Sequence, residues 1–289
     1  MNILVTGGAG FIGSALIEKL LLDDSNDIYC LDNYFTGHQL FFDTRVNHIP
    51  GSTNKILDLV DVKADVVYHL GEYARISTSF EDIDKVWEYN INGTYQVLKY
   101  CLQNNSKLVY GGSSSKFGNS GKDENLTPYS WVKAKNVELI KNYGQWFGLD
   151  YAIAYFFNVY GPGQISDGKY ATVIGIFENL YKSNKPLKVV KPGTQKRFFT
   201  HIQDVARGLH DIGQHGHGDG YCLCDENSLF TIEQVARMFS NNVEYIQEQK
   251  GNREDPIVPF KRCEEELGWN TEYNLKDYID NIKKEYRDV

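Results

Sequence analysis

The feature that most constrains the fold lies at the start of the chain, where an apolar run, Ile3 to Val5, leads into a cluster of glycines. Phe11 to Ile17 follows at once with helical spacing, so the order is strand, glycine-rich turn and helix. Such a turn presents backbone N–H groups and a helix N-terminus to a pyrophosphate. Gly7 can make the tight turn, Gly10 lets the backbone approach the phosphates, and Gly13 lets the helix pack against the strand. The stretch predicts a dinucleotide site; a tight turn without a ligand is the alternative.

The composition limits the possible functions. Of the 289 residues, 42% are hydrophobic and 24% are charged, which is ordinary for a soluble globular protein of one large domain or two smaller ones. No apolar run is long enough to span a membrane, and a core strand begins at the N-terminus, so we expect a cytoplasmic protein without a signal peptide. The net charge of −8 argues against general nucleic-acid binding but leaves room for a small anionic ligand.

The cysteines and histidines show no metal-binding pattern. The five cysteines lack paired zinc spacing, and Cys222 and Cys224 alternate within an apolar run that reads as a strand. His210, His215 and His217 lie near a glycine-rich loop without regularly spaced acidic or thiol partners. We therefore expect reduced structural thiols, a polar turn and no metal site.

A second strand is predicted from Asp27 to Leu31, and it ends at Asp32. This carboxylate lies about 20 residues beyond the glycines, where an acidic side chain accepts hydrogen bonds from an adenosine ribose. It would repel a 2′-phosphate, and no arginine follows it closely, so we expect NAD rather than NADP. The alternative for Asp32 is a solvent-facing residue at a strand end. Asp58 is a further candidate, either as an acceptor for the adenine amino group or as a helix-terminal residue.

The following segments predict the fold class. Candidate strands cover residues 45–49, 65–70 and 107–110, and a helix is predicted over residues 82–103. Strands that alternate with helices in this way form parallel βαβ units. We therefore expect an α/β fold with a doubly wound parallel sheet.

Three polar side chains follow the strand at 107–110. Ser113 lies at its carboxyl end, where open α/β sheets bind ligands. Tyr129 and Lys133 are four residues apart in a helix predicted over residues 129–147, so both face the same way. An ammonium beside a phenol stabilises the phenolate, which makes a tyrosine a usable acid/base near neutral pH. The spacing alone occurs by chance in many helices, but with the glycine turn and the serine it predicts a catalytic group.

Together these motifs make the chain similar to one family. It resembles the extended short-chain dehydrogenases/reductases, in the branch of NAD-dependent epimerases and dehydratases that modify nucleotide-linked sugars, and the likeness covers nearly the whole chain. The motifs that carry it are Thr6–Gly13 (TGGAGFIG), His69–Leu70, Asn90–Thr94 (NINGT), Ser113 with Phe117–Gly118, Tyr129 with Lys133, Phe157–Pro162 (FNVYGP), Arg197–Phe199 (RFF) and Leu267–Trp269 (LGW).

The resemblance implies a Rossmann-type domain over residues 1–160 and a smaller C-terminal α/β substrate-binding lobe, mainly residues 161–289, with interleaving allowed. Tyr129 would be the general acid/base, Lys133 its modulator and a contact to the nicotinamide ribose, and Ser113 a partner of the reacting hydroxyl. Asn158 and Arg197 would contact the substrate diphosphate, for which a guanidinium is well suited. The expected cofactor contacts are Gly7, Gly10, Phe11, Ile12, Gly13, Asp32, Asn33, Asp58, Leu59, Leu70 and Lys133, and the expected substrate contacts are Asn158, Arg197, Asp255 and Arg75.

Several residues depart from the family pattern where the sugar would bind. Ser114 and Ser115 stand where sugar-nucleotide 4,6-dehydratases carry Asp-Glu, so the proton-transfer groups for elimination are missing. The segment from Gly118 to Tyr129 is shorter than is usual in the family. The other departures are Glu72 and Tyr73 in place of small residues, Tyr155 in place of a frequent arginine, and Arg253 two rather than three residues before Asp255. Glu72 and Arg75 follow a strand end, so they could reach the pocket or simply face solvent.

The leading hypothesis is an NAD-dependent nucleotide-sugar epimerase that acts at C4 of a nucleoside diphosphate hexose through a 4-keto intermediate. We expect a UDP-, GDP- or dTDP-linked sugar as partner, no nucleic acid or membrane, and, by resemblance, a homodimer through the helices at 82–103 and 129–147. One alternative is a reductase, dehydrogenase or decarboxylase of the same family. Another is a non-catalytic NAD-binding sensor, against which the intact set of Ser113, Tyr129 and Lys133 argues.

Overall fold

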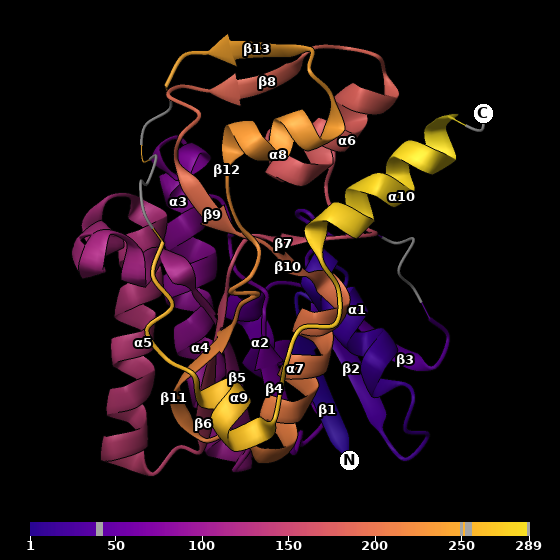
Figure 1. The fold of residues 1–289 in the computed structure, drawn as a ribbon. Helices are drawn as coiled ribbons and strands as arrows, with labels where there is room; N and C mark the ends of the chain where they lie inside the picture. Colours follow the sequence, from indigo (N-terminus) through magenta and orange to yellow (C-terminus); the bar gives the residue numbers. More distant parts are fainter. Residues whose placement is uncertain (39–42, 249–250, 252–255, 288–289) are drawn as a thin grey trace.

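The computed structural model describes residues 1–38, 43–248, 251 and 256–287, and its centre is a seven-stranded sheet in which every pair is parallel (Figure 1). The strand order is β11-β6-β5-β4-β1-β2-β3, so the chain starts in the middle and reverses direction between β1 and β4. This confirms the predicted doubly wound sheet, and the reversal opens a crevice at the carboxyl ends of these strands. The strands are β1 Asn2–Thr6, β2 Asp27–Asp32, β3 Val46–Pro50, β4 Val66–His69, β5 Lys107–Ser113, β6 Tyr151–Phe156 and β11 Gly218–Leu223.

Helices cover both faces of the sheet, because side chains of a strand alternate between its faces. On β1, Ile3 and Val5 join the core beneath α1 (Phe11–Leu20), α7 (Ile202–His215) and α9 (Arg262–Leu267). Leu4, between them, joins the opposite core with α2 (Ile56–Leu59), α4 (Gly93–Asn104) and α5 (Pro128–Phe147). Both β11 and α7 come from beyond residue 160, so the two parts of the chain interleave.

The two long predicted helices form with identifiable ends. The helix predicted over 82–103 is α3 (Ile83–Lys85), a wider π-helical turn η4 (Val86–Asn92) and then α4. Such π turns are rare and frequent near functional sites. The next helix, α5, starts behind Thr127, whose side chain accepts a hydrogen bond from the Ser130 amide, and ends at Gly148 in the left-handed region.

A smaller lobe lies above the carboxyl ends of the strands (Figure 1). Its core packs the helices α6 (Val173–Lys182), α8 (Ile232–Phe239) and α10 (Leu275–Arg287) with β8 (Leu187–Val190). β13 (Val243–Ile246) pairs with β8 in parallel. The remaining strand pairs are β7 Val159–Tyr160 with β10 Thr200–His201 and β9 Lys196–Phe198 with β12 Leu229–Thr231, and short turns are η2 Thr53–Lys55, η3 Ser77–Phe80 and η5 Ser114–Asn125.

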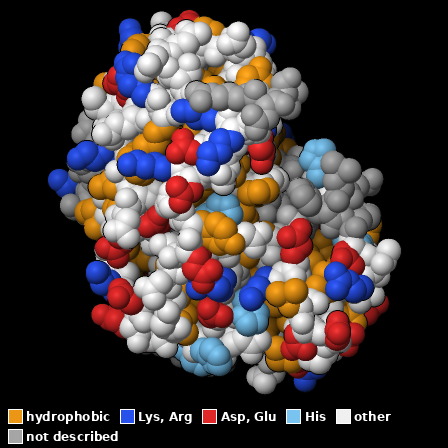
Figure 2. Space-filling view, turned by 45° about the vertical axis from the view of Figure 1, so that its right-hand side comes forward, with side chains coloured by type: hydrophobic (Ala, Val, Ile, Leu, Met, Phe, Trp, Pro, Cys, Tyr) orange, Lys and Arg blue, Asp and Glu red, His pale blue; other side chains and the backbone are white. Residues whose placement is uncertain are grey.

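Acidic and basic side chains are interspersed over the face drawn in Figure 2. Among the described residues, no helix combines the length and the hydropathy that crossing a bilayer requires.

Candidate active site

A cavity of about 490 Å³ lies at the carboxyl ends of β1, β4 and β5, between the sheet and the smaller lobe. Its wall includes the glycine turn, the end of β5 and the first turns of α5, and Arg197 belongs to the smaller lobe. A second cavity of about 70 Å³ adjoins it and shares Gly7, Gly10 and Leu70. Together the two cavities extend from Asp32 at the end of β2, past the glycine turn, to Ser113 at the end of β5.

The glycines of the turn have different physical tasks. Gly7 has φ of +70°, and a Cβ there would lie 2.7 Å from the backbone of Gly71, so only glycine fits between β1 and β4. A Cβ on Gly13 would lie 2.2 Å from the carbonyl oxygen of Gly7. A Cβ on Gly10 would meet only that same oxygen, at 3.2 Å, and Gly10 lines both cavities. The turn is therefore close-packed behind Gly7 and Gly13 and open at Gly10, where a phosphate would approach.

Asp32 ends β2 at the smaller cavity, as predicted. Its carboxylate accepts hydrogen bonds from the backbone amides of Ala9, at 2.9 Å, and Tyr34, at 2.7 Å. Burial raises the pKa of this carboxyl, while the two amide bonds oppose that shift. Asn33 lines the same cavity. A carboxylate held on the glycine turn, with room beside it, fits the ribose of a dinucleotide without a 2′-phosphate.

Asp58 and Leu59 are not among the described residues that line either cavity, so their contact with the cofactor stays a prediction. Asp58 is exposed on the short helix α2, eight residues beyond the end of β3. Ser52 and Thr53, which follow β3 after Gly51, line the smaller cavity. Their hydroxyl oxygens are buried without a hydrogen-bond partner in the described part of the chain, and that of Thr53 faces Gly93, where an added Cβ would lie 2.2 Å from it. The end of the predicted strand at residue 49 was the signal that could have found them.

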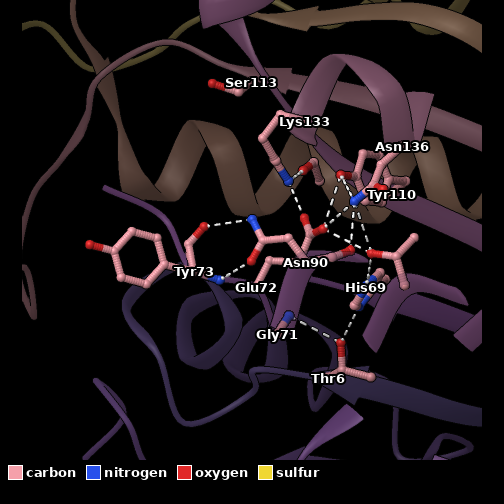
Figure 3. Close-up of polar contacts among 12 residues, drawn as sticks. Thr6, His69, Gly71, Glu72, Tyr73, Asn90, Tyr110, Ser113, Lys133 and Asn136 are labelled. Atoms are coloured by element: carbon pink, nitrogen blue, oxygen red, sulfur yellow. Dashed lines mark hydrogen bonds and ion pairs between the residues drawn. The ribbon is translucent and has the colours of Figure 1, made fainter. Parts of the chain in front are cut away.

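The three predicted catalytic residues lie on the larger cavity. Ser113 ends β5, and its hydroxyl oxygen accepts a hydrogen bond from the Ser115 amide at 3.2 Å. Tyr129 lies in the first turn of α5 and is 8% exposed, and Lys133 follows one turn later. Ser113 stands apart from the hydrogen-bond network drawn in Figure 3 and remains on the cavity side.

Lys133 is held by an acidic residue from the loop after β4 (Figure 3). Its ammonium donates to the Glu72 carboxylate and to the carbonyl oxygen of Gly111, and it lies 4.4 Å from the centroid of the Tyr110 ring. The side chains of Lys133 and Glu72 are 6% and 3% exposed. The structure therefore places Glu72 in direct contact with Lys133, whereas the sequence indicated only that Glu72 could reach the pocket.

A buried chain of hydrogen bonds links this ion pair to the glycine turn. Thr94 donates to Glu72 at 2.8 Å, so its oxygen accepts from Nε2 of His69, at 3.0 Å. Nδ1 of His69 then accepts from the Thr6 hydroxyl at 2.8 Å, and that oxygen accepts from the Gly71 amide at 3.1 Å. Burial lowers the pKa of His69 to about 4, which agrees with this neutral tautomer.

The expected substrate contacts that the structure describes also line the larger cavity. Asn158 has φ of +33° and donates to the carbonyl oxygen of Phe198 at 2.8 Å, while Arg197 donates to that of Lys196 at 2.6 Å. Arg75 donates to the carbonyl oxygen of Tyr170 at 2.6 Å, and burial lowers the pKa of its guanidinium. All three side chains line the larger cavity.

Two further points complete the site. Asp255 lies outside the described residues, although Gly251, from the same segment, lines the larger cavity. Within the described ranges, no three His, Cys, Asp or Glu side chains gather as a metal site would require.

Comparison with known proteins identifies the family. The family model of the NAD dependent epimerase/dehydratase family matches residues 3–224. A putative UDP-glucose 4-epimerase of Methanocaldococcus jannaschii is 30% identical, over 97% of this chain and 96% of its own. UDP-glucuronic acid decarboxylase 6 of Arabidopsis thaliana is 28% identical over 99% and 89%. The structure of a UDP-glucuronic acid 4-epimerase from Bacillus cereus, in complex with UDP-glucuronic acid and NAD, superposes with a TM-score of 0.87 at 24% identity, covering 100% and 99% of the two chains.

The chain therefore belongs to the NAD-dependent epimerase/dehydratase family, which confirms the resemblance. Its cofactor is NAD, as predicted, and the close-packed turn and Asp32 fit that dinucleotide.

Proposed function

We propose that this enzyme is a nucleotide-sugar epimerase that inverts C4 of a nucleoside diphosphate hexose through a 4-keto intermediate. The observation that carries the proposal is that Ser113, Tyr129 and Lys133 line one cavity with the glycine turn. The names of the relatives, a UDP-glucose epimerase and two proteins of UDP-glucuronic acid metabolism, support a nucleotide sugar as substrate. Ser114 and Ser115 favour epimerisation over dehydration, because hydroxyls replace the two carboxylates that elimination needs.

The protein's own groups would manage the proton. Tyr129, as the phenolate, would take the proton of the C4 hydroxyl directly or through Ser113, and would return it after the 4-keto sugar has turned over. Bound NAD supplies the hydride acceptor and donor for this chemistry. The Lys133 ammonium would stabilise the phenolate of Tyr129. Asn158 and Arg197 would bind the diphosphate, so that only the sugar ring moves.

Decarboxylation of a nucleotide-linked uronic acid is the second candidate, and Arg75 favours it. Arg75 lines the cavity that holds Tyr129, and its described hydrogen bonds go to the carbonyl oxygens of Tyr170 and Ala74. Among the described residues, no carboxylate forms a salt bridge with it. A half-buried cation of this kind suits the carboxylate of a sugar acid.

One experiment separates the candidates. The purified protein, without added NAD, is incubated with UDP-, GDP- and dTDP-linked hexoses and with UDP-linked uronic acids, and the products are identified by mass spectrometry and NMR. An epimerase gives a product of unchanged mass with inverted C4. A decarboxylase gives a lighter pentose product and carbon dioxide, and a reductase or dehydrogenase changes the nicotinamide absorbance in proportion to product.

We also propose a cytoplasmic homodimer. An aromatic patch on η4, α4 and α5 supports the dimer: Trp87 and Trp131 stack with an interplanar angle of 6° while 47% and 37% exposed, and Tyr95 and Trp146 are 45% and 59% exposed. Exposed aromatic patches of this kind mark protein interfaces. The five cysteines are free and buried, which suits a reducing compartment.

A further inference from the structure

Glu72 is the one acidic side chain among the described residues that line the larger cavity. One oxygen accepts from Lys133, and the other accepts from Thr94 at 2.8 Å, Asn136 at 2.8 Å and Tyr110 at 3.1 Å (Figure 3). Four donors, from β5, α4 and α5, thus converge on one side chain from the loop after β4. Because an ionised carboxylate only accepts hydrogen bonds, this arrangement holds Glu72 as the anion.

The burial of this ion pair makes it unlike a surface salt bridge. Taking two charges out of water is expensive and is offset only by close pairing and by further hydrogen bonds. Here Glu72 has its three additional donors, and Lys133 has the Gly111 carbonyl oxygen and the face of the Tyr110 ring. Asn136, which donates to Glu72, also donates to the carbonyl oxygen of Asn90, so the neighbouring helices support the carboxylate too. Both charges of the ion pair are therefore held in place by hydrogen bonds from the surrounding elements.

The position of the pair connects it with the reaction. Lys133 is one turn from Tyr129 on α5, and both side chains line the cavity together with Glu72. An ammonium stabilises a nearby phenolate, but an ammonium bound to a carboxylate exerts a much weaker field. The charge that Tyr129 senses therefore depends on Glu72 as well as on Lys133.

We propose that Glu72 is a positioning residue of the reaction: it fixes the Lys133 ammonium and offsets its charge, and thereby sets the pH at which Tyr129 works as acid and base. The part that concerns catalysis rests on the proposed function. The part that concerns the ionisation of Tyr129 does not, and it is testable without a sugar.

The other titratable groups around Glu72 lie on β4, on β5 and on its own loop after β4. His69 on β4 is neutral above about pH 4. Tyr110 on β5 is kept protonated, because burial and Glu72 raise its pKa well above the usual value. Arg75, on the same loop as Glu72, and Arg197 are the other cations among the described residues that line the cavity, and Thr94 and Asn136 are uncharged. Near neutral pH, a change in ionisation at this place therefore reports on Tyr129 and on the ion pair beside it.

The first test is a direct titration of Tyr129 in the NAD-bound protein. The near-ultraviolet absorbance of tyrosinate is followed against pH in the protein and in its Tyr129→Phe counterpart, and the difference gives the ionisation of Tyr129 alone. The pair is then repeated with Glu72→Gln, which removes the negative charge but nearly keeps the shape. We expect Tyr129 to ionise at a pH lower by about one unit in Glu72→Gln, because the charge of Lys133 is no longer offset.

The matched control is Thr94→Val, which removes one hydrogen bond to Glu72 but leaves its charge. We expect this variant to lose stability and to keep the ionisation pH of Tyr129. Equal ionisation curves in the wild type and in Glu72→Gln would overturn the proposal. If Glu72→Gln does not fold, Glu72→Asp is measured in its place, because it keeps the charge but withdraws it from Lys133. We expect the ionisation curve of Tyr129 to shift in the same direction by less. An unshifted curve in Glu72→Asp would also overturn the proposal.

The second test is a double-mutant cycle on the pH dependence of kcat with the sugar that the wild type converts. Glu72→Gln is expected to move the acid limb to lower pH by about one unit, and by less in a Lys133→Met background, because the part of its effect that comes from holding the ammonium in place is lost there. An equal shift in both backgrounds would show that Glu72 does not act through Lys133. If the wild type converts no sugar, the proposed function fails, while the titration still decides the role of Glu72.

Discussion

Gly10, which caps the N-terminus of α1, and Gly13, in the first turn of that helix, should respond differently to substitution by alanine. In Gly13→Ala, the new Cβ would lie 2.2 Å from the Gly7 carbonyl oxygen and 2.7 Å from Cα of Gly8. Since 3.0 Å is about the shortest distance that real Cβ atoms show, the turn must move by at least 0.8 Å. Both atoms belong to the backbone, so no side-chain rotation relieves the contact. We expect a net loss of about 1–2 kcal/mol in the free energy of unfolding, because overpacking costs ~1–3 kcal/mol and alanine recovers ~0.5–1 kcal/mol within a helix.

Gly10→Ala is the matched variant, three residues earlier in the chain. Its Cβ meets a single protein atom, the Gly7 carbonyl oxygen at 3.2 Å, and otherwise occupies the space where a phosphate would approach. We expect the stability of the NAD-free protein to stay within about 0.5 kcal/mol of the wild type. The affinity for NAD should fall at least about tenfold, which corresponds to ~1.4 kcal/mol.

Two measurements on NAD-free protein decide between these effects. Thermal unfolding followed by circular dichroism should show Gly13→Ala melting about 2–4 °C below the wild type and Gly10→Ala melting close to it. Calorimetric titration with NAD should rank Gly10→Ala as a weak binder despite its normal stability. The reasoning is refuted if Gly10→Ala binds NAD like the wild type, or if Gly13→Ala melts at the wild-type temperature.

Two other predictions concern acid stability and assembly. The pKa of His69 is about 4 in the folded chain, against an ordinary value of 6.5, so the unfolded state binds the proton more readily and stability is lost as the pH falls from 6.5 to 4. The free energy of unfolding should fall by ~3 kcal/mol over this range, and this fall should be absent in His69→Gln. Urea unfolding at several pH values measures it, and an equally steep fall in the variant would contradict the prediction. Trp131→Glu should turn the proposed homodimer into a monomer in light scattering, because it places a charge in the stack with Trp87; a dimer that withstands this change would place the interface elsewhere.

The features that sequence could predict are those that depend on local order. The strand, turn and helix at residues 1–20 follow from an apolar run, the glycine spacing and helical periodicity, and the structure reproduces them. Tyr129 and Lys133 face the same cavity because four residues make about one helical turn, whatever the rest of the chain does. Their partner Ser113 was predicted from its place at a strand end.

The features that sequence missed depend on distant segments. The ion pair of Glu72 and Lys133 joins residues 61 positions apart, and nothing in either local pattern shows that one faces the other. Ser52 and Thr53, which line the smaller cavity, were missed because the place where β3 ends decides which residues reach that cavity. Likewise, β11 joins β6 at the edge of the sheet across more than 60 residues of chain.

The central claim is that hydrogen leaves C4 of the sugar and returns to it within the same site, with Tyr129 handling the proton. The most direct measurement uses a nucleotide sugar deuterated at C4, the purified protein with its bound NAD, and no added cofactor. The account predicts that the C4 epimer retains its deuterium, as seen by NMR, and that Tyr129→Phe slows the reaction by about 10²–10⁴-fold while NAD remains bound. Loss of the deuterium to water, or full turnover in Tyr129→Phe, would contradict it.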